Sequence, residues 1–401
     1  AAAVVQALNF VLESATPPRG FKPELIASVE AVDDATVRIT ATAPDAILPQ
    51  RLIGASTGIL ALSAYGADGT VNPMGTGTGP FVLVDEAEGQ WIKLDANPSY
   101  WGGEVALDSV EVQFIPDGAV RAGMVRTGEA DITRNVPIPS VPLIEASDDA
   151  VVDRADLPRT TTLYTNNASG PTADLKVRQA ISHALDREIL ALAVLEGAAA
   201  PGIGPFPAWE AWTNPDLTAY PYDPDRAIEL LAEAGVGEEG IELRLWTYNS
   251  RAELPDLAVA IQAMLKDVGI TAEVRLAEYS ALIDDVKAGE YDLFLLSRGH
   301  LVDVYDPSGF LGADYSCEGS FNLSGYCDTE FDAELATTSA MDAEADRYVV
   351  YEDLQERIQL DAVSAFVVYL GQIDAHTNRV EGYQIHPLGH YVLTPTLTVS
   401  G

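Results

Sequence analysis

The feature that most constrains the fold is an alternation of strand and helix patterns between residues 241 and 296. Three short apolar segments, at 241–248, 270–276 and 291–296, predict buried strands. Amphipathic segments at 254–268 and 280–287 lie between them and predict helices. Such a βαβαβ unit favours a mostly parallel sheet and therefore places the chain in the α/β class.

The length of the chain indicates more than one hydrophobic core. At 401 residues, two or three domains are expected. The segment 197–215 is rich in Gly, Pro and Trp and has no periodicity, so it predicts a linker. A new unit begins after it, with Asp223 as a helix N-cap and Pro224 at the first helical position. Before it, residues 173–190 predict one long helix capped by Asp174.

The charge excludes some classes of partner. The formal net charge is -38, and the acidic residues are spread along the chain rather than grouped in blocks. Such a chain repels nucleic acid and anionic membrane surfaces. No run of eighteen apolar residues is present, so no membrane-spanning helix is expected. The sequence starts inside a helical pattern without Met, so we expect a missing upstream segment that would carry any targeting signal.

The two cysteines, Cys317 and Cys327, are ten residues apart in a polar loop. A disulfide between them would contribute about 2–3 kcal/mol by restricting the unfolded chain, and it would imply an oxidising compartment. The alternative is two unpaired thiols. A metal site is disfavoured, because neither a CxxC motif nor a nearby His completes a ligand set.

The candidate ligand loop follows the apolar segment 291–296. Arg298, His300, Asp303 and Asp306 come directly after this predicted strand, with Tyr305 among them. A loop in that position lies at the carboxyl edge of the sheet, where open α/β sheets bind ligands. Asp306 precedes a proline, and this pattern favours a helix N-cap over a ligand contact.

Several segments together resemble one protein family. They are GTGPFVL at 77–83, LDANPSYWGG at 94–103, DLKVRQAISHALDREIL at 174–190, YDPDRAIELLAEAG at 222–235, DVYDPSGF at 303–310 and HPLG at 386–389. In this order they are similar to the extracytoplasmic solute-binding proteins of the peptide/nickel/opine ABC transporters, in particular the dipeptide-binding branch. The resemblance covers nearly the whole chain.

The resemblance implies a two-lobed fold of the periplasmic-binding-protein type II class, with a hinge and a small extra domain. Residues 1–71 would form part of the extra domain, with its amino-terminal portion missing. Residues 72–205 with 376–401 would form lobe one. Residues 206–375 would form lobe two and carry the main ligand loop.

The resemblance also implies site residues. Asp303 aligns with the carboxylate that meets the α-ammonium group of the ligand in dipeptide-binding relatives, and its alternatives are capping a helix or pairing with Arg298. Arg298 would bind a ligand carboxylate or neutralise Asp303. The relatives' second contact, an Arg and a Tyr, falls near Tyr248 and Ser250 here.

Neighbours of that second contact are further candidates. Arg251 lies close to the relatives' Arg but out of register, and it is the candidate anchor for a ligand carboxylate. Trp246 and Tyr248 could stack on an apolar ligand or pack in the core. His300, with His386 and His390, raises chelated nickel as an alternative solute, although the 386–390 pair falls in a predicted turn.

The function implied is capture of a small solute, most simply a peptide, between closing lobes and delivery to an ABC permease. The protein would be a monomer outside the cytoplasm, periplasmic or lipid-anchored, with no cofactor. Chelated nickel, an opine, a sugar or a chemosensory role are alternatives. A hydrolase is disfavoured, because neither a GxSxG nor an HExxH motif is present.

Overall fold

The computed structural model describes residues 1–390 and 393–401 and confirms a mixed α/β fold. The chain forms two compact units. Unit one comprises residues 1–155 and 372–401, and unit two comprises residues 156–371. The chain therefore passes from one unit to the other twice, after Ala155 and after Gly371.

Unit two is built on a six-stranded sheet with the order β11-β10-β12-β8-β13-β9. The strands are β8 (Arg159–Thr165), β9 (Ala199–Pro201), β10 (Ile241–Tyr248), β11 (Ile270–Ala277), β12 (Leu293–Gly299) and β13 (Ser364–Leu370). Strand β10 pairs in parallel with β11 and β12, whereas β8 runs antiparallel to both of its neighbours. The sheet is mixed, and the predicted parallel part is its β11-β10-β12 portion.

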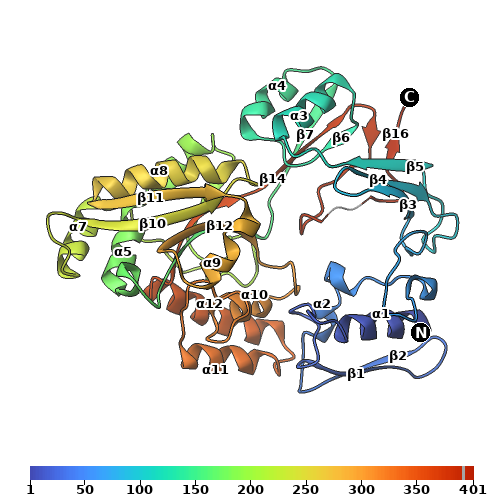
Figure 1. Cartoon of the computed structure of the whole chain (residues 1–401), viewed down its shortest axis with the longest axis horizontal. Helices are drawn as coiled ribbons and strands as arrows, with labels where there is room; N and C mark the ends of the chain where they lie inside the picture. Colours follow the sequence, from blue (N-terminus) through green and yellow to red (C-terminus); the bar gives the residue numbers. More distant parts are fainter. Residues whose placement is uncertain (391–392) are drawn as a thin grey trace. The chain divides into compact units, whose positions relative to one another are not determined.

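The predicted βαβαβ unit is confirmed. Helix α8 (Glu253–Asp267) connects β10 to β11, and a 3-10 turn followed by α9 (Ile283–Lys287) connects β11 to β12. Figure 1 shows α8 lying along the β10 and β11 strands. Its buried stripe comprises Leu254, Leu257, Ala258, Ile261 and Leu265, at the three- and four-residue spacing of one helix face.

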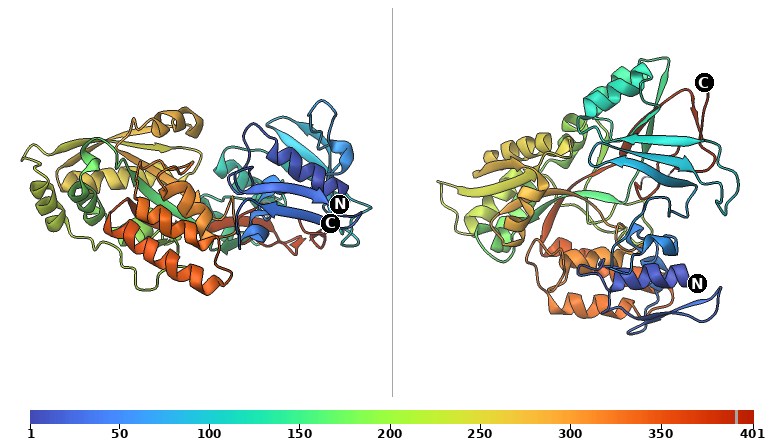
Figure 2. Two further views of the ribbon diagram at one scale, coloured as in Figure 1. Left: turned by 90° about the horizontal axis from the view of Figure 1, so that it is seen from below. Right: turned by 45° about the vertical axis from the view of Figure 1, so that its right-hand side comes forward.

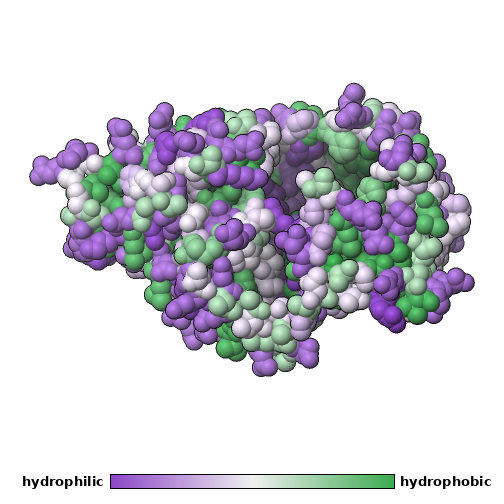
Figure 3. Space-filling view, turned by 60° about the horizontal axis from the view of Figure 1, so that its bottom comes forward, coloured by the Kyte–Doolittle hydropathy of each residue, from purple (hydrophilic) through white to green (hydrophobic). Residues whose placement is uncertain are grey.

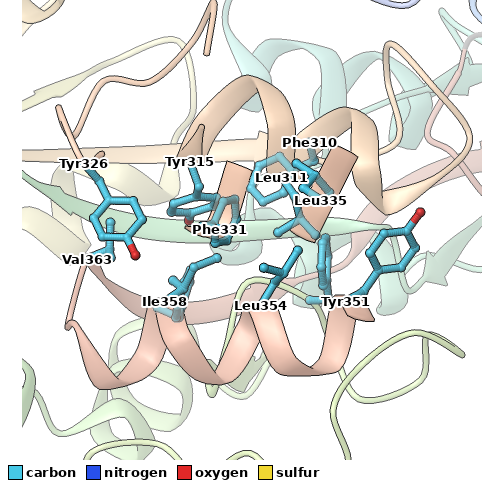
Figure 4. Packing of buried hydrophobic residues seen from close by; sticks show 12 residues of the cluster. Phe310, Leu311, Tyr315, Tyr326, Phe331, Leu335, Tyr351, Leu354, Ile358 and Val363 are labelled. Carbon is cyan, nitrogen blue, oxygen red and sulfur yellow. The ribbon is translucent and has the colours of Figure 1, made fainter. Parts of the chain in front are cut away.

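Three further helices of unit two pack around an aromatic core. They are α10 (Pro307–Tyr315), α11 (Thr329–Thr338) and α12 (Glu344–Leu360). Figure 4 shows their side chains meeting between the helices, with Phe331 and Leu354 at the centre and Tyr315 and Tyr351 on either side. Cys317 and Cys327 form a disulfide in the loop that joins α10 to α11. The disulfide prediction is therefore confirmed.

The prediction of one helix over 173–190 was wrong. Helix α5 (Leu175–Ala184) ends where Leu185 takes an extended conformation, and the short helix α6 (Arg187–Ile189) starts anew with Asp186 as its N-cap. Arg187 explains the break. Its buried guanidinium donates hydrogen bonds to the carbonyls of Ser182, Leu185, Tyr220 and Phe366. The carbonyls of Ser182 and Leu185 would accept from backbone amides in a continuous helix, and here they accept from the Arg187 side chain instead. The predicted cap of α5 by Asp174 is confirmed.

The prediction of a linker at 197–215 was also wrong, because this segment is integrated into unit two. Strand β9 pairs with β13, and Phe206 is completely buried in the core around α10–α12. Gln355 fixes the segment further by donating a hydrogen bond of 2.7 Å to the Trp212 carbonyl. Helix α7 (Pro224–Glu233) follows, capped by Asp223 as expected.

Unit one contains several small sheets. Helix α1 (Ala2–Leu12) packs on the hairpin of β1 (Ile26–Ala31) and β2 (Val37–Ala41) around Leu8, Phe21, Ile26 and Val29, as two views show (Figures 1 and 2). Other sheets are β3-β4-β5 and β6-β14-β7. Their strands are β3 (Phe81–Ala87), β4 (Trp91–Ala96), β5 (Ser109–Gln113), β6 (Ile132–Thr133), β7 (Ala150–Ala155) and β14 (Gln372–Thr377).

Unit one also contains further α-helices and strands. They are α2 (Leu48–Arg51), α3 (Gly118–Thr127), α4 (Val141–Glu145), β15 (Val380–Glu381) and β16 (Thr398–Val399). The α1 hairpin has its own apolar cluster, which supports a separate extra domain over residues 1–71. The division into three domains nevertheless stays a prediction. Residues 156–205, expected in lobe one, lie in unit two, where β8 is a central strand.

Hydrophilic residues are spread over the face drawn in Figure 3 and alternate with small apolar areas. Among the described residues, no helix combines the length and the apolar composition that a membrane crossing requires.

Candidate functional site

The topology of unit two singles out one edge of its sheet. From β10 the chain moves outward to β11, and it then returns across β10 to β12. Connections therefore leave β10 and β12 in opposite directions, which makes the gap between the carboxyl ends of these two strands a topological switch point. Residues 249–252 follow β10 and residues 300–306 follow β12. We call this place the switch edge.

Asp303 lies in the loop after β12 and is half-buried. It interacts electrostatically with Arg298.

Arg298 makes an ion pair with Asp314. Its two nitrogens donate to one Asp314 oxygen at 3.1 and 2.8 Å, and Asp314 is completely buried. The guanidinium also lies over the rings of Phe321 and Phe310, at 4.1 and 5.5 Å from their centroids. Burial acts to lower the pKa of Arg298, but the Asp314 carboxylate outweighs it and raises that pKa. These contacts favour a structural role for Arg298.

His300 is buried and faces Glu210. Its Nε2 atom lies 2.8 Å from each of the two Glu210 carboxylate oxygens, and the ring packs edge-on against Phe206 and Phe310. With Nε2 held by a carboxylate, this histidine fastens the 206–215 segment to the end of β12. That arrangement leaves a nickel role for His300 without support.

Asp306 is the N-cap of α10, as predicted. Its carboxylate accepts from the Ser308 amide at 3.0 Å and from the Tyr351 hydroxyl at 2.7 Å, and Arg347 lies 3.6 Å away. These partners leave no reason to assign Asp306 to a ligand.

The two aromatics of β10 pack within unit two. Trp246 is buried and lies under Arg275, whose guanidinium is 4.3 Å from the ring centroid. Tyr248 is buried edge-on against Tyr279, and its hydroxyl donates to the Ser297 carbonyl at 3.3 Å. Both side chains therefore belong to the packed interior of unit two.

The exposed candidates lie in the two loops. Ser250 is exposed after β10, and Tyr305 is 43% exposed in the 300–306 loop. The Arg251 side chain is 29% exposed, and its Nη1 atom lies 3.8 Å from the Glu253 Oε1 atom. These residues are accessible to a solute at the switch edge.

Sequence reasoning missed Arg159, which the fold brings to the same edge. Because β8 runs antiparallel to β12, its first residue, Arg159, is opposite Gly299, the last residue of β12. The Arg159 Nη1 atom donates to the Ser297 carbonyl at 3.2 Å, the same oxygen that Tyr248 contacts. Burial, followed by the neighbouring Arg251 cation, lowers the pKa of Arg159 to about 10. No pattern near position 159 signals a site, because the strand pairing alone places this residue.

His386 and His390 belong to unit one, with ring centroids 5.1 Å apart. Burial lowers the pKa of His386, and the neighbouring His390 and Arg134 act in the same direction. Within the described residues, no group of three or more His, Cys, Asp or Glu side chains is placed to hold a metal ion. The pair therefore does not extend to a metal centre there.

Comparison with known proteins identifies the protein family. The profile of the bacterial extracellular solute-binding proteins, family 5, matches residues 1–322. The chain is 33% identical to a probable di/tripeptide-binding protein 5 of Pseudomonas aeruginosa over 92% of this chain and 71% of that protein. It is 30% identical to heme-binding protein A of Haemophilus influenzae, over 92% of this chain and 69% of that protein.

A solved structure agrees with these matches. The periplasmic binding protein DppA of Helicobacter pylori, in complex with the peptide STSA, superposes with a TM-score of 0.87 at 26% identity, covering 100% of this chain and 81% of that one. The family match spans most of the chain, and the fold agrees over its whole length. The chain belongs to family 5 of the bacterial extracellular solute-binding proteins.

Proposed function

We propose that the protein binds short peptides outside the cytoplasm and delivers them to the permease of an ABC importer. The observation that carries the proposal is the position of Asp303, half-buried in the loop after β12 at the switch point of the unit-two sheet. A carboxylate there suits the α-ammonium group of a peptide, because a charge-assisted hydrogen bond is strong and orients the ligand. The names of relatives that are di/tripeptide-binding proteins support the same class of solute.

The proposal assigns roles to the exposed loop residues. Tyr305 and Ser250 would contact the peptide from the two loops of the switch edge. Trp246 and Tyr248 would hold these loops from below rather than touch the solute, since both are buried. The closure of two lobes on the solute remains a prediction, as does a monomeric state.

A ligand screen tests the class of solute. Thermal unfolding would be followed with di- and tripeptides, heme and a nickel–histidine chelate, each in excess. A peptide at 100 times its dissociation constant should stabilise the protein by about 2.7 kcal/mol, which shifts the midpoint visibly. Stabilisation by heme or the chelate, with none by any peptide, would overturn the peptide proposal.

The same experiment separates binding from catalysis. We propose that the protein binds without turnover, and the family match supports this because the family is one of solute-binding proteins. Chromatography of a stabilising peptide after prolonged incubation should return it intact. Hydrolysis that depends on the concentration of the protein would contradict a purely binding role.

A further inference from the structure

The loop that carries Asp303 begins with a buried polar pair. His300 is the first residue after β12, and its side chain is completely shielded from solvent, while the Glu210 side chain is 8% exposed. The Nε2 atom of His300 lies 2.8 Å from both carboxylate oxygens of Glu210, whereas Nδ1 has no hydrogen-bond partner among the described residues. One ring nitrogen therefore makes the whole polar contact of this side chain.

Apolar rings surround the pair. Phe206 and Phe310 lie edge-on to the His300 imidazole, with ring centroids at 4.9 and 5.9 Å, and both phenylalanines are buried. A hydrogen bond to a carboxylate is stronger in such an environment than in water, and breaking it would leave a buried polar group without a partner. Moving His300 away from this position is therefore costly.

The far end of the same loop is fixed as well. Asp306 caps α10 and is buried. Between the two ends, Leu301 and Val304 are buried, so the loop backbone is also held by packing. Asp303 lies three residues after His300 and three residues before Asp306. The two ends of the loop together therefore determine where the Asp303 carboxylate lies.

We propose that Glu210 and His300 form a positioning pair for the solute site, which sets the place of Asp303 and with it the preference for a free α-ammonium group. This inference rests on the proposed function, in which Asp303 binds that group. Glu210 comes from the segment between β9 and α7. That segment takes part in the selection of the solute through His300, without contact to the solute itself.

The preference for a free amino group is the readout that tests the pair. The di- or tripeptide that stabilises the protein most in the screen would be titrated calorimetrically with its α-amino group free and N-acetylated. The wild-type protein should bind the free form about 10- to 100-fold more tightly, the range for hydrogen bonds to charged groups. Replacement of a residue with a purely structural role would weaken both forms by the same factor and leave this ratio unchanged.

Two substitutions of His300 separate the roles of its ring nitrogens. A glutamine amide reaches about as far as Nε2, whereas an asparagine amide reaches only about as far as Nδ1. His300→Gln should therefore keep the bond to Glu210 and most of the preference, and His300→Asn should reduce the preference at least about 5-fold, as for the loss of one hydrogen bond. Glu210→Leu removes the acceptor instead and should act like His300→Asn, and it provides the same test should His300→Asn not fold.

His376 in β14 provides the matched control. Its Nε2 atom also faces a carboxylate, that of Asp153 at 3.4 Å, but this pair belongs to unit one. His376→Asn should leave the preference unchanged even where it lowers the midpoint of unfolding. The double variant Glu210→Leu/His300→Asn should lose no more of the preference than either single variant, because both substitutions break the same bond.

Each way of failing has its own signature. If no peptide binds the wild-type protein, the proposed function fails and the positioning role fails with it. If a peptide binds but the wild-type protein does not distinguish its two forms, or Glu210→Leu distinguishes them equally well, peptide binding stands and the positioning role is wrong. Equal losses in His300→Gln and His300→Asn would show that the bond to Glu210 is not the cause. A loss in His376→Asn would show that general destabilisation is the cause.

Discussion

Two carboxylates three residues apart illustrate how position decides role at the scale of single residues. Asp306 is 4% exposed and accepts hydrogen bonds from a backbone amide, a tyrosine hydroxyl and a serine hydroxyl. Asp303 is half-buried in the loop that precedes it. Asp306 therefore joins α10 to α12, whereas Asp303 is accessible to a ligand.

Replacement of these two residues should therefore destabilise the protein to different extents. Asp306→Ala removes the cap of α10 and leaves Tyr351 and Arg347 without their shared acceptor, so it should destabilise the protein by about 3 kcal/mol or more. Asp303→Ala should cost less than Asp306→Ala, because Asp303 is half-buried whereas Asp306 is 4% exposed. Urea denaturation of both variants measures the difference. Equal losses would show that Asp303 is structural too.

Arg187 is the second residue whose role is settled by its partners. Burial lowers the pKa of its guanidinium to about 10, and the donors are used on backbone carbonyls. Arg187→Met keeps the volume but strands these carbonyls, so we expect a loss of about 3 kcal/mol in unfolding free energy. Arg38→Gln, at an exposed position of β2, is the matched control and should change stability by less than about 0.5 kcal/mol. A mild effect of Arg187→Met would mean that water satisfies the carbonyls.

At the scale of elements, the loop between α10 and α11 depends on the Cys317–Cys327 bond. Asn322 reinforces the loop through hydrogen bonds to the carbonyls of Ser316 and Tyr326, at 2.9 and 2.6 Å. The double variant Cys317→Ser/Cys327→Ser should lose about 2–3 kcal/mol, because the unfolded chain regains the freedom that the bond removes. Calorimetric unfolding with and without reductant checks this. A reductant effect on the double variant would point to an unrelated cause.

Periodicity predicted β10, β11 and α8 to within one residue at each end, and it predicted β12 and α9 to within three residues. Strand β10 coincides with the predicted segment 241–248, and α8 begins and ends within one residue of the predicted helix 254–268. Local patterns sufficed here because burial on both faces makes a strand continuously apolar, and one buried stripe makes a helix periodic. The capping roles of Asp174, Asp223 and Asp306 were predictable for the same reason, since each contact lies within one turn.

Contacts between residues that are far apart in the sequence could not be predicted. The break at Leu185 depends on Arg187 reaching Phe366, far away in the sequence, and the burial of the 197–215 segment depends on β13. The Arg298–Asp314 pair and the His300–Glu210 pair also join separate elements. The loop carrying Asp303 could be located from the sequence, whereas Arg159 required the antiparallel pairing of β8 with β12.

At the scale of the whole molecule, the net charge of -38 sets the dependence of stability on salt. Self-repulsion among the acidic residues disfavours the compact state, and added ions screen it. The midpoint of thermal unfolding should rise by several degrees between about 10 mM and 500 mM sodium chloride, where the Debye length falls from about 30 Å to a few ångströms. Potassium chloride should act equally. A midpoint that falls with salt would show that attractive pairs, such as Arg226 with Glu229, dominate instead.

The measurement that tests the central claim most directly is a calorimetric comparison of a bound peptide with its N-acetylated form, on the wild-type protein and on Asp303→Asn. Capture of the α-ammonium group by Asp303 predicts that acetylation weakens binding to the wild-type protein about 10- to 100-fold, and that Asp303→Asn binds the free peptide correspondingly more weakly. The variant should no longer distinguish the two ligands. A variant that distinguishes them as well as the wild-type protein does would contradict the assignment of the switch edge as the peptide site.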